Sequence, residues 1–352
     1  MLTGRALVTF AILALASGIA VARDPAPVGL LRDVVFTRYP PFADNGERLR
    51  RLVSPLDALQ IEQRMGGNRD ALRAEPLDPA QQRFTLYVPR DPGPAIGYAL
   101  LVFVPPSDDA RVPVQWIPAL DRTHTIFVSA AHSGNDANVL DRREPLALLA
   151  AYGVMHHYHI NPAQVYIGGF SGGSRVALRL ALGYPDLFRG ALLDAGSDLV
   201  GTAQVPLPPP DLLHVFQQSS RIVFVTGDED VIRQAQLARA DASLEYWCAF
   251  DKDSLTAMHT GHALADAFVF AQALRELQRR KVPDAARMET CREAHQRALK
   301  ARLEQVESLA HSGQTTQAIR LLTRIDASYG GLADPRSVEL WRVINARNAR
   351  QH

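Results

Sequence analysis

The sequence predicts an α/β fold with a mostly parallel central sheet, helices on both faces of that sheet, and a helical tail at the C-terminus. Two kinds of segment support this prediction. Some are short and apolar, as expected of strands buried on both faces, and others have helical periodicity. The two kinds alternate along the chain, which indicates βαβ units and therefore parallel strands. Hydrophobic residues make up 47% of the 352 residues, enough for a sizeable core.

Each expected element follows from its local pattern. The apolar or alternating segments predict strands over 84–88, 98–104, 125–130, 165–168, 191–193, 221–226 and 244–250. The periodic segments predict helices over 145–158, 174–182, 231–240 and 264–277. Three more helical patterns, which glycines separate, cover 285–310, 315–327 and 335–346.

Composition divides the chain into four parts. Residues 1–22 form a candidate signal peptide, and residues 23–80 form an irregular leader rich in proline and glycine with short helical patterns at 54–64 and 68–73. The α/β domain covers 81–282 and the helical tail covers 283–352. One helical hairpin in the tail resembles a single tetratricopeptide repeat. Because such arrays need several repeats to be stable, we expect the tail to pack on the sheet domain, where it also offers a surface for a protein partner.

The N-terminus predicts export to a secreted or periplasmic location. Arg5 precedes an apolar run over 6–16, and Ala20-Val21-Ala22 has the small-residue pattern of a cleavage site. The alternative interpretation is an uncleaved membrane anchor. No later segment has eighteen consecutive apolar residues, so we expect no stable membrane insertion after cleavage.

Charge and cysteine content exclude several classes of function. The 38 basic and 37 acidic residues give a formal net charge of +1, which gives no support to a nucleic-acid-binding protein. Cys248 and Cys291 are the only cysteines, and in an oxidising compartment they predict a disulfide; in the cytosol they would be ordinary thiols. No C-x-x-C motif or cysteine–histidine cluster at zinc spacing occurs, so no metal site is predicted.

The strongest functional motif is G-x-S-x-G, formed by Gly169, Ser171 and Gly173. The motif follows a short strand pattern and opens a helical one, which is the context of a nucleophile elbow. In an elbow the serine lies on a tight strand-to-helix turn, and the helix N-terminus presents amide N–H groups to a developing oxyanion. The competing interpretation is a phosphate-binding glycine loop, but no lysine follows at the P-loop spacing.

A serine hydroxyl needs a base to take its proton, and that base needs an acid to orient it. An elbow predicts the chain order serine, then acid, then histidine. The predicted strand over 221–226 runs into Gly227-Asp228-Glu229-Asp230, and we select Asp230 as the acid. Asp228 is the alternative and Asp194 a third candidate. Each of these acids could instead be a solvated loop residue or a helix cap.

The base is expected after the next strand, where Met258-His259-Thr260-Gly261-His262 offers two histidines. Gly-His before a helix is the usual layout, so we select His262, with His259 as the alternative. The loop 129–136, which contains His132, also belongs at the carboxyl edge of the sheet and is a further candidate for lining the site.

These motifs resemble those of secreted α/β-hydrolase esterases related to extracellular polyhydroxybutyrate depolymerases and feruloyl esterases. The resemblance covers about 82–277 and rests on Gly169-Phe170-Ser171-Gly172-Gly173-Ser174, on Tyr184-Pro185-Asp186-Leu187-Phe188 after the elbow helix, and on Gly261-His262. It implies an α/β-hydrolase fold for residues 81–282. It also implies a serine hydrolase that cleaves small or polymeric carboxylic esters without a cofactor. It does not identify the substrate.

One segment departs from the family pattern. These esterases usually carry His-Gly after the third strand, where it supplies one oxyanion N–H. Here that strand runs into Pro105-Pro106-Ser107-Asp108, and proline has no N–H to donate. The candidate oxyanion donors are therefore the N–H groups of Ser107 and Gly172. The alternatives to an active esterase are a peptidase of the same fold and a weakly active or inactive hydrolase-fold binding protein.

Overall fold

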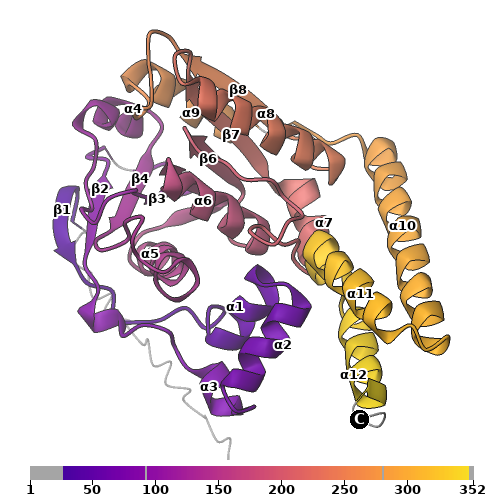
Figure 1. Ribbon diagram of the computed structural model, residues 1–352. Coiled ribbons are helices and arrows are strands. Elements are labelled where there is room, and N and C mark those ends of the chain that lie inside the picture. Colours follow the sequence, from indigo (N-terminus) through magenta and orange to yellow (C-terminus); the bar gives the residue numbers. More distant parts are fainter. Residues whose placement is uncertain (1–26, 92, 280, 349–352) are drawn as a thin grey trace, which may run out of the picture.

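The computed structural model describes residues 27–91, 93–279 and 281–348, and its centre is one eight-stranded sheet (Figure 1). The strands lie in the order β1-β2-β4-β3-β5-β6-β7-β8. β2 pairs antiparallel with both β1 and β4, and all other neighbours are parallel. The strands are β1 Gly29–Val34, β2 Phe84–Val88, β3 Tyr98–Val104, β4 Thr125–Ala130, β5 Ile160–Phe170, β6 Gly190–Asp194, β7 Arg221–Gly227 and β8 Lys252–Ala257.

Twelve α-helices lie among the described residues. They are α1 Asn45–Leu52, α2 Pro55–Arg64, α3 Arg69–Arg73, α4 Ile117–Arg122, α5 Glu144–His157, α6 Gly172–Gly183, α7 Pro210–Ser219, α8 Val231–Tyr246, α9 Ala267–Gln278, α10 Ala285–His311, α11 Thr315–Tyr329 and α12 Arg336–Asn348. Short 3-10 turns cover Pro79–Gln81, Val114–Trp116 and Gly330–Ala333, and a π turn covers Val139–Arg143. The strand order, the parallel βαβ units and the sharp turn between β5 and α6 define an α/β-hydrolase fold, as predicted.

The sheet separates two hydrophobic cores. The larger core packs the buried helix α5 and the inner face of α6 against one face of the sheet. The smaller core packs α4 and α9 against the other face, and its centre is the stack of Trp116 on Phe270, whose ring centroids lie 3.9 Å apart. Because both faces are covered, β3, β4, β6 and β7 are buried over almost their whole length, which explains their continuous apolar sequences.

One predicted strand is wrong, and both edge strands were missed. The segment 244–250 is not a strand, because it forms the last turn of α8 and the loop that follows. Its apolar residues Leu244, Trp247 and Ala249 are buried, and Trp247 packs against His295 of α10 and Tyr329 of α11. The strand at this edge is β8, whose sequence Lys-Asp-Ser-Leu-Thr-Ala is mostly polar. At the other edge, β1 was not predicted, and α1, α4 and α7 were not predicted either.

The leader and the tail contact each other. α2 packs against both α11 and α12 (Figure 1). The carboxylate of Asp326 on α11 accepts the N–H of Leu56 in the first turn of α2 at 3.0 Å. The tail also touches the sheet domain, where the N–H of Gly331 donates to the carbonyl of Leu207 at 2.7 Å.

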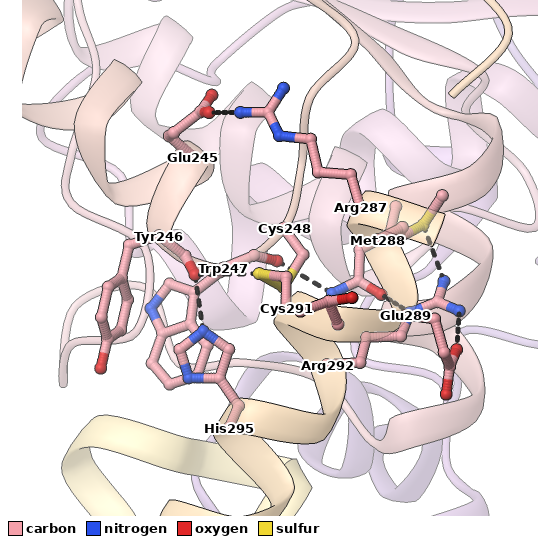
Figure 2. The surroundings of a disulfide bond; sticks show 12 residues. Glu245, Tyr246, Trp247, Cys248, Arg287, Met288, Glu289, Cys291, Arg292 and His295 are labelled. Carbon is pink, nitrogen blue, oxygen red and sulfur yellow. Dashed lines mark hydrogen bonds and ion pairs between the residues drawn. A yellow bond between two sulfur atoms is a disulfide. The ribbon is translucent and has the colours of Figure 1, made fainter. Parts of the chain in front are cut away.

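The predicted disulfide between Cys248 and Cys291 is present (Figure 2). It joins the segment after α8 to the second turn of α10, with the two Cα atoms 6.0 Å apart. The predicted signal peptide, by contrast, lies outside the described residues. Among the helices that are described, none has both the length and the hydropathy of a membrane span.

Candidate active site

Ser171 lies at the tip of a sharp turn between β5 and α6. Its backbone has φ 55° and ψ −117°, a conformation that non-glycine residues rarely adopt and that is typical of functional sites. The turn leaves no room for side chains at the two flanking glycines. A methyl group on Gly169 would lie 2.3 Å from the carbonyl carbon of Gly173, and one on Gly173 would lie 1.9 Å from the carbonyl oxygen of Val104. The G-x-S-x-G spacing is thus required by the geometry of the turn.

The His262 imidazole lies between Ser171 and Asp230. Its Nε2 is 3.0 Å from the Ser171 hydroxyl oxygen, and its Nδ1 is 2.7 Å from Asp230 Oδ2. Asp230 is 9% exposed, whereas the His262 side chain is 39% exposed. The Phe170 ring packs against the imidazole with the centroids 5.0 Å apart. The structure therefore brings together the serine, histidine and acid selected from the sequence.

Asp230 has two hydrogen-bonding roles. Its Oδ1 accepts the Arg233 N–H at 3.2 Å and so caps the N-terminus of α8, while its Oδ2 faces His262. The sequence offered a helix cap as the alternative to a functional role for this acid. In the structure, Asp230 makes both contacts: it caps α8 and it contacts His262.

The alternative candidates lie elsewhere in the same loops. Asp228 accepts the Thr260 N–H at 3.0 Å, so it contacts the backbone of the histidine loop, and backbone N–H groups of Thr260 and His259 lower the pKa of its carboxyl. The contact with the Ser171 hydroxyl is made by His262 and not by His259, which is exposed and has a positive φ of 53°.

Asp194, the third candidate acid, lies beneath the site at the end of β6. It is 1% exposed, and its Oδ2 accepts the Ala265 N–H at 2.8 Å. Its backbone carbonyl accepts the Ser171 N–H at 2.8 Å and the Ser174 hydroxyl at 2.7 Å. Burial raises the pKa of this carboxyl to about 7. One residue therefore connects the backbone of the elbow to the loop that carries His262.

The two candidate oxyanion donors lie on neighbouring segments. Gly172 is the first residue of α6, where amide N–H groups have no partner within the helix. Ser107 is exposed and lies in a loop that is bonded to the loop after β4: Asn135 N–H donates to the Pro106 carbonyl at 2.9 Å. The Ser107 segment therefore reaches this region through its contact with the loop after β4.

Asn135 lies against Gly172, a contact that the sequence did not reveal. A methyl group on Gly172 would lie 2.1 Å from Asn135 Oδ1 and 3.2 Å from its Nδ2. The side-chain amide is therefore held beside the first residue of the elbow helix. The loop after β4 was a candidate for lining the site, but no pattern distinguished Asn135 within it.

Arg143 connects the loops that surround the nucleophile and was also missed. This buried guanidinium donates to the carbonyls of Ser133 at 2.9 Å and Pro105 at 3.0 Å, with Gly172 O at 3.5 Å. Burial lowers the pKa of Arg143. An arginine in an Arg-Arg pair before a helix has no sequence signal for this role, because its three acceptors lie in three separate segments.

One group of side chains in the described part of the chain has metal-ligating atoms close together. It lies away from Ser171, where the segment after α8 meets α10. Cys248, Cys291 and His295 have sulfur and nitrogen atoms within 4.8 Å of one another. Both sulfurs are bonded to each other, so neither is a thiolate ligand in this state.

Comparison with known proteins gives only distant likenesses. No protein-family model and no curated protein matches the chain. Among solved structures, it is similar to a thermophilic esterase from Thermogutta terrifontis, with 16% identity and a TM-score of 0.41 over 58% of this chain and 87% of that one. It is also similar to an S-formylglutathione hydrolase from Staphylococcus aureus, with 14% identity and a TM-score of 0.42 over 56% and 91% of the chains.

A third similar structure is a dipeptidyl peptidase 4 from Porphyromonas gingivalis, with 14% identity and a TM-score of 0.43. The match covers 57% of this chain but only 34% of the peptidase, so the chain corresponds to about a third of that enzyme. These likenesses concern the fold alone.

Proposed function

We propose that the protein is an exported serine hydrolase that cleaves carboxylic esters. The observation that carries the proposal is the position of His262, whose two ring nitrogens face the Ser171 hydroxyl at 3.0 Å and the Asp230 carboxylate at 2.7 Å. A serine, a base and an orienting acid in this arrangement form the constellation that activates a serine nucleophile.

The contacts support a separate role for each residue. Ser171 Oγ attacks the ester carbonyl while its proton moves to His262 Nε2, and the imidazolium then gives that proton to the leaving alcohol. A water molecule next attacks the acyl-enzyme through the same base, which releases the carboxylic acid and restores the serine hydroxyl. Asp230 accepts the Nδ1–H of His262 and so leaves Nε2 free to accept the serine proton.

The developing oxyanion needs N–H donors at its position. The first-turn N–H of Gly172 is one candidate, and the backbone N–H of Ser107 is the second. The side-chain amide of Asn135, which lies against Gly172, is an additional candidate donor. This amide could supply the donor that Pro105 and Pro106 cannot.

Labelling with a fluorophosphonate probe tests the activated serine, and hydrolysis of short p-nitrophenyl esters tests the reaction. We expect the native protein to be labelled and to hydrolyse the esters. Ser171→Ala should abolish both, while Ser308→Ala, at an exposed serine of the tail helix α10, serves as the control. Absence of labelling in the correctly folded native protein would indicate an inactive hydrolase fold. Unchanged activity in Ser171→Ala would reject the mechanism.

Export remains part of this proposal. Support comes from the sequence pattern at 1–22 and from the disulfide, since disulfides persist in oxidising compartments. Intact-mass analysis of protein from the producing cell's envelope or medium should show a chain that begins after Ala22. A chain that retains Met1 would contradict cleavage.

A further inference from the structure

A second cavity lies where the tail meets the hydrolase body, away from the nucleophile. Its volume is about 220 Å³, and it is enclosed by α7, the segment around Trp247, α10 and the 3-10 turn that follows α11. None of its lining residues belongs to the loops that carry Ser171, Asp230 or His262. The lining residues are Pro210, Leu213, His214, Gln217, Trp247, Cys248, Arg292, His295, Gln296, Leu299 and Leu332.

The cavity is mostly apolar, with one charged side chain in its wall. Leu213, Leu299, Leu332 and Trp247 provide apolar surface, and no aspartate or glutamate is among the described residues that line the cavity. Arg292 supplies the charge, and its side chain is only 11% exposed. An apolar cavity with a few converging polar groups is the usual form of a small-molecule site.

The Arg292 guanidinium has few good acceptors for a group so deeply buried. Its Nε donates to Gln217 Oε1 at 2.6 Å, and its Nη2 faces the weakly accepting Met288 sulfur at 3.0 Å (Figure 2). Its Nη1 forms an ion pair with Glu289 Oε2 at 3.7 Å, which is too long for a hydrogen bond, and that glutamate is 62% exposed. A guanidinium has five N–H donors, and among the described residues Gln217 supplies this one with its only hydrogen bond to oxygen.

The neighbouring polar groups do not supply the missing acceptor. The second atom of the Gln217 amide, Nε2, donates to the Trp247 carbonyl at 2.9 Å, which holds Gln217 in place. His295 contacts the Tyr246 carbonyl through Nε2 at 2.6 Å. Burial and the nearby Arg292 lower the pKa of His214, so this histidine is neutral near pH 7 and adds no second charge.

We propose that this cavity binds a small monocarboxylic acid, with its carboxylate on Arg292 and its apolar body between Leu213, Leu299 and Leu332. A carboxylate matches the guanidinium with two parallel hydrogen bonds and neutralises its charge in a poorly solvated position. The 220 Å³ volume lies below the roughly 300 Å³ at which pockets begin to hold drug-sized ligands, so the acid is short or has a single ring.

The hydrolase domain and the tail both contribute residues to the cavity wall. A bound ligand would therefore contact both parts and stabilise their packing. Leu213 and Gln217 belong to α7 of the body, whereas Arg292 and Leu299 belong to α10 of the tail. The Cys248–Cys291 disulfide spans the same joint one residue away from both Trp247 and Arg292. A ligand that bridges these elements should raise the melting temperature, because it binds only the folded, docked arrangement.

Isothermal titration calorimetry tests the proposal with the full-length processed protein and with hexanoate, benzoate and hexan-1-ol as probes. We expect at least one of the two carboxylates to bind, and the alcohol to bind at least about tenfold more weakly because it lacks the charge. Hexanoate alone would identify a chain-like acid and benzoate alone an aromatic one. At ten times its Kd the bound acid should raise Tm by about 2 °C.

Variants locate the binding. Arg292→Met keeps the length and apolar character of the side chain and should weaken carboxylate binding by about 10- to 100-fold. Arg297→Met, on the exposed side of the same helix, is the matched control and should leave affinity unchanged. Leu299→Phe should block the cavity while keeping Arg292. Glu289→Gln should strengthen binding, because it removes the carboxylate that competes for Nη1.

Equal affinity of the alcohol and the carboxylates would overturn the role of Arg292, and so would full binding by a folded Arg292→Met variant. Absence of binding by both acids at millimolar concentration would overturn the site itself. Binding is measured without any ester, so these outcomes are independent of whether Ser171 is an active nucleophile.

Discussion

Asp230 shows how one side chain can satisfy two structural requirements at the site. Its two carboxylate oxygens have different partners: Oδ1 caps α8 and Oδ2 orients His262. The cap fixes the carboxylate at the N-terminus of α8, and the carboxylate in turn orients the imidazole. Asparagine can still cap the helix through its amide oxygen. Its NH2 group, however, is a donor and cannot accept the imidazole N–H.

The first prediction therefore separates the two aspartates of the same turn. Asp230→Asn should reduce kcat on p-nitrophenyl acetate by about 10⁴-fold with little loss of stability, because the cap survives while the favoured imidazole tautomer changes. Asp228→Asn should reduce kcat far less, because its carboxylate contacts the Thr260 backbone and not the ring. Steady-state kinetics and thermal melts of both variants check this. The reverse ranking would reassign the acid to Asp228.

Asn135 gives the second prediction. If its side-chain amide donates to the oxyanion, Asn135→Ala should lower kcat by about 10²- to 10³-fold and leave KM nearly unchanged, because the donor acts in the transition state. Asp136→Ala in the same exposed loop is the control. Comparable kcat values for the two variants would place the second donor on the Ser107 backbone.

At this scale the sequence predicts the residues that belong to motifs and misses those that belong to contacts. Ser171, Asp230 and His262 follow from a spaced glycine pattern and a fixed chain order. Asn135 and Arg143 reach the same site from the loop after β4 and from the turn before α5. Their roles depend on contacts between three loops that are separate in the sequence, and such contacts leave no local sequence pattern.

Among the elements, the buried strands β3 and β4 were predicted to the residue, β5, β6 and β7 were predicted shorter than they are, and the edge strands β1 and β8 were missed. β3 and β4 have continuous apolar sequences because both faces are covered. β8 is an edge strand whose first two paired residues are the charged Lys252 and Asp253. Its hydrophobic pattern is therefore too weak to predict a strand. His262 was still placed after the last strand, because the Gly-His signal is independent of where that strand lies.

Arg221 gives the third prediction, which concerns the joint between β7, β8 and α9. Its guanidinium is fully buried and pairs with Asp251, with Glu276 at 2.8 Å and with Asp253 at 3.3 Å. Arg221→Met would leave the buried Asp251 carboxylate and the partly buried Glu276 carboxylate without their counter-charge and should lower the free energy of unfolding by about 3–5 kcal/mol. Urea unfolding measures this. Arg111→Met, which breaks an exposed ion pair with Asp109, should change stability by less than about 1 kcal/mol.

For the whole molecule, the tail is held by a covalent bond at one end and by packing at the other. The disulfide fixes the beginning of α10, and α11 and α12 pack against α2 of the leader. The sequence predicted the disulfide from its compartment and the even cysteine count. The pairing of the leader with the tail could not be predicted, because its partners are about 270 residues apart: Leu56 N–H and the Asp326 carboxylate.

The fourth prediction concerns the covalent end. The two cysteines are 43 residues apart, and a crosslink over a loop of this length stabilises the folded state by about 4 kcal/mol in the chain-entropy description. The double variant Cys248→Ser/Cys291→Ser should lose up to that amount in urea unfolding, yet keep kcat on a short ester because the joint lies outside the Ser171 loops. Loss of activity in the folded variant would show that the tail controls the active site.

The fifth prediction concerns the packed end and its dependence on pH. Burial raises the pKa of Asp326 from 3.8 to about 6, against the lowering effects of the neighbouring Ser54 hydroxyl and of the Leu56 N–H. The folded state therefore binds this proton more tightly than the unfolded state, so stability rises as pH falls through 6 toward 4. The buried carboxyl of Asp194 acts in the same direction, with its pKa near 7.

Asp326→Asn isolates this contribution, because the amide oxygen can still accept the Leu56 N–H while the charge is absent. We expect the wild-type protein to gain on the order of 1–2 kcal/mol between pH 7.5 and pH 5 relative to the variant. Paired urea titrations at the two pH values measure the difference. An identical pH dependence in the two proteins would mean that Asp326 has an ordinary pKa. It would also mean that water reaches the contact between α2 and α11.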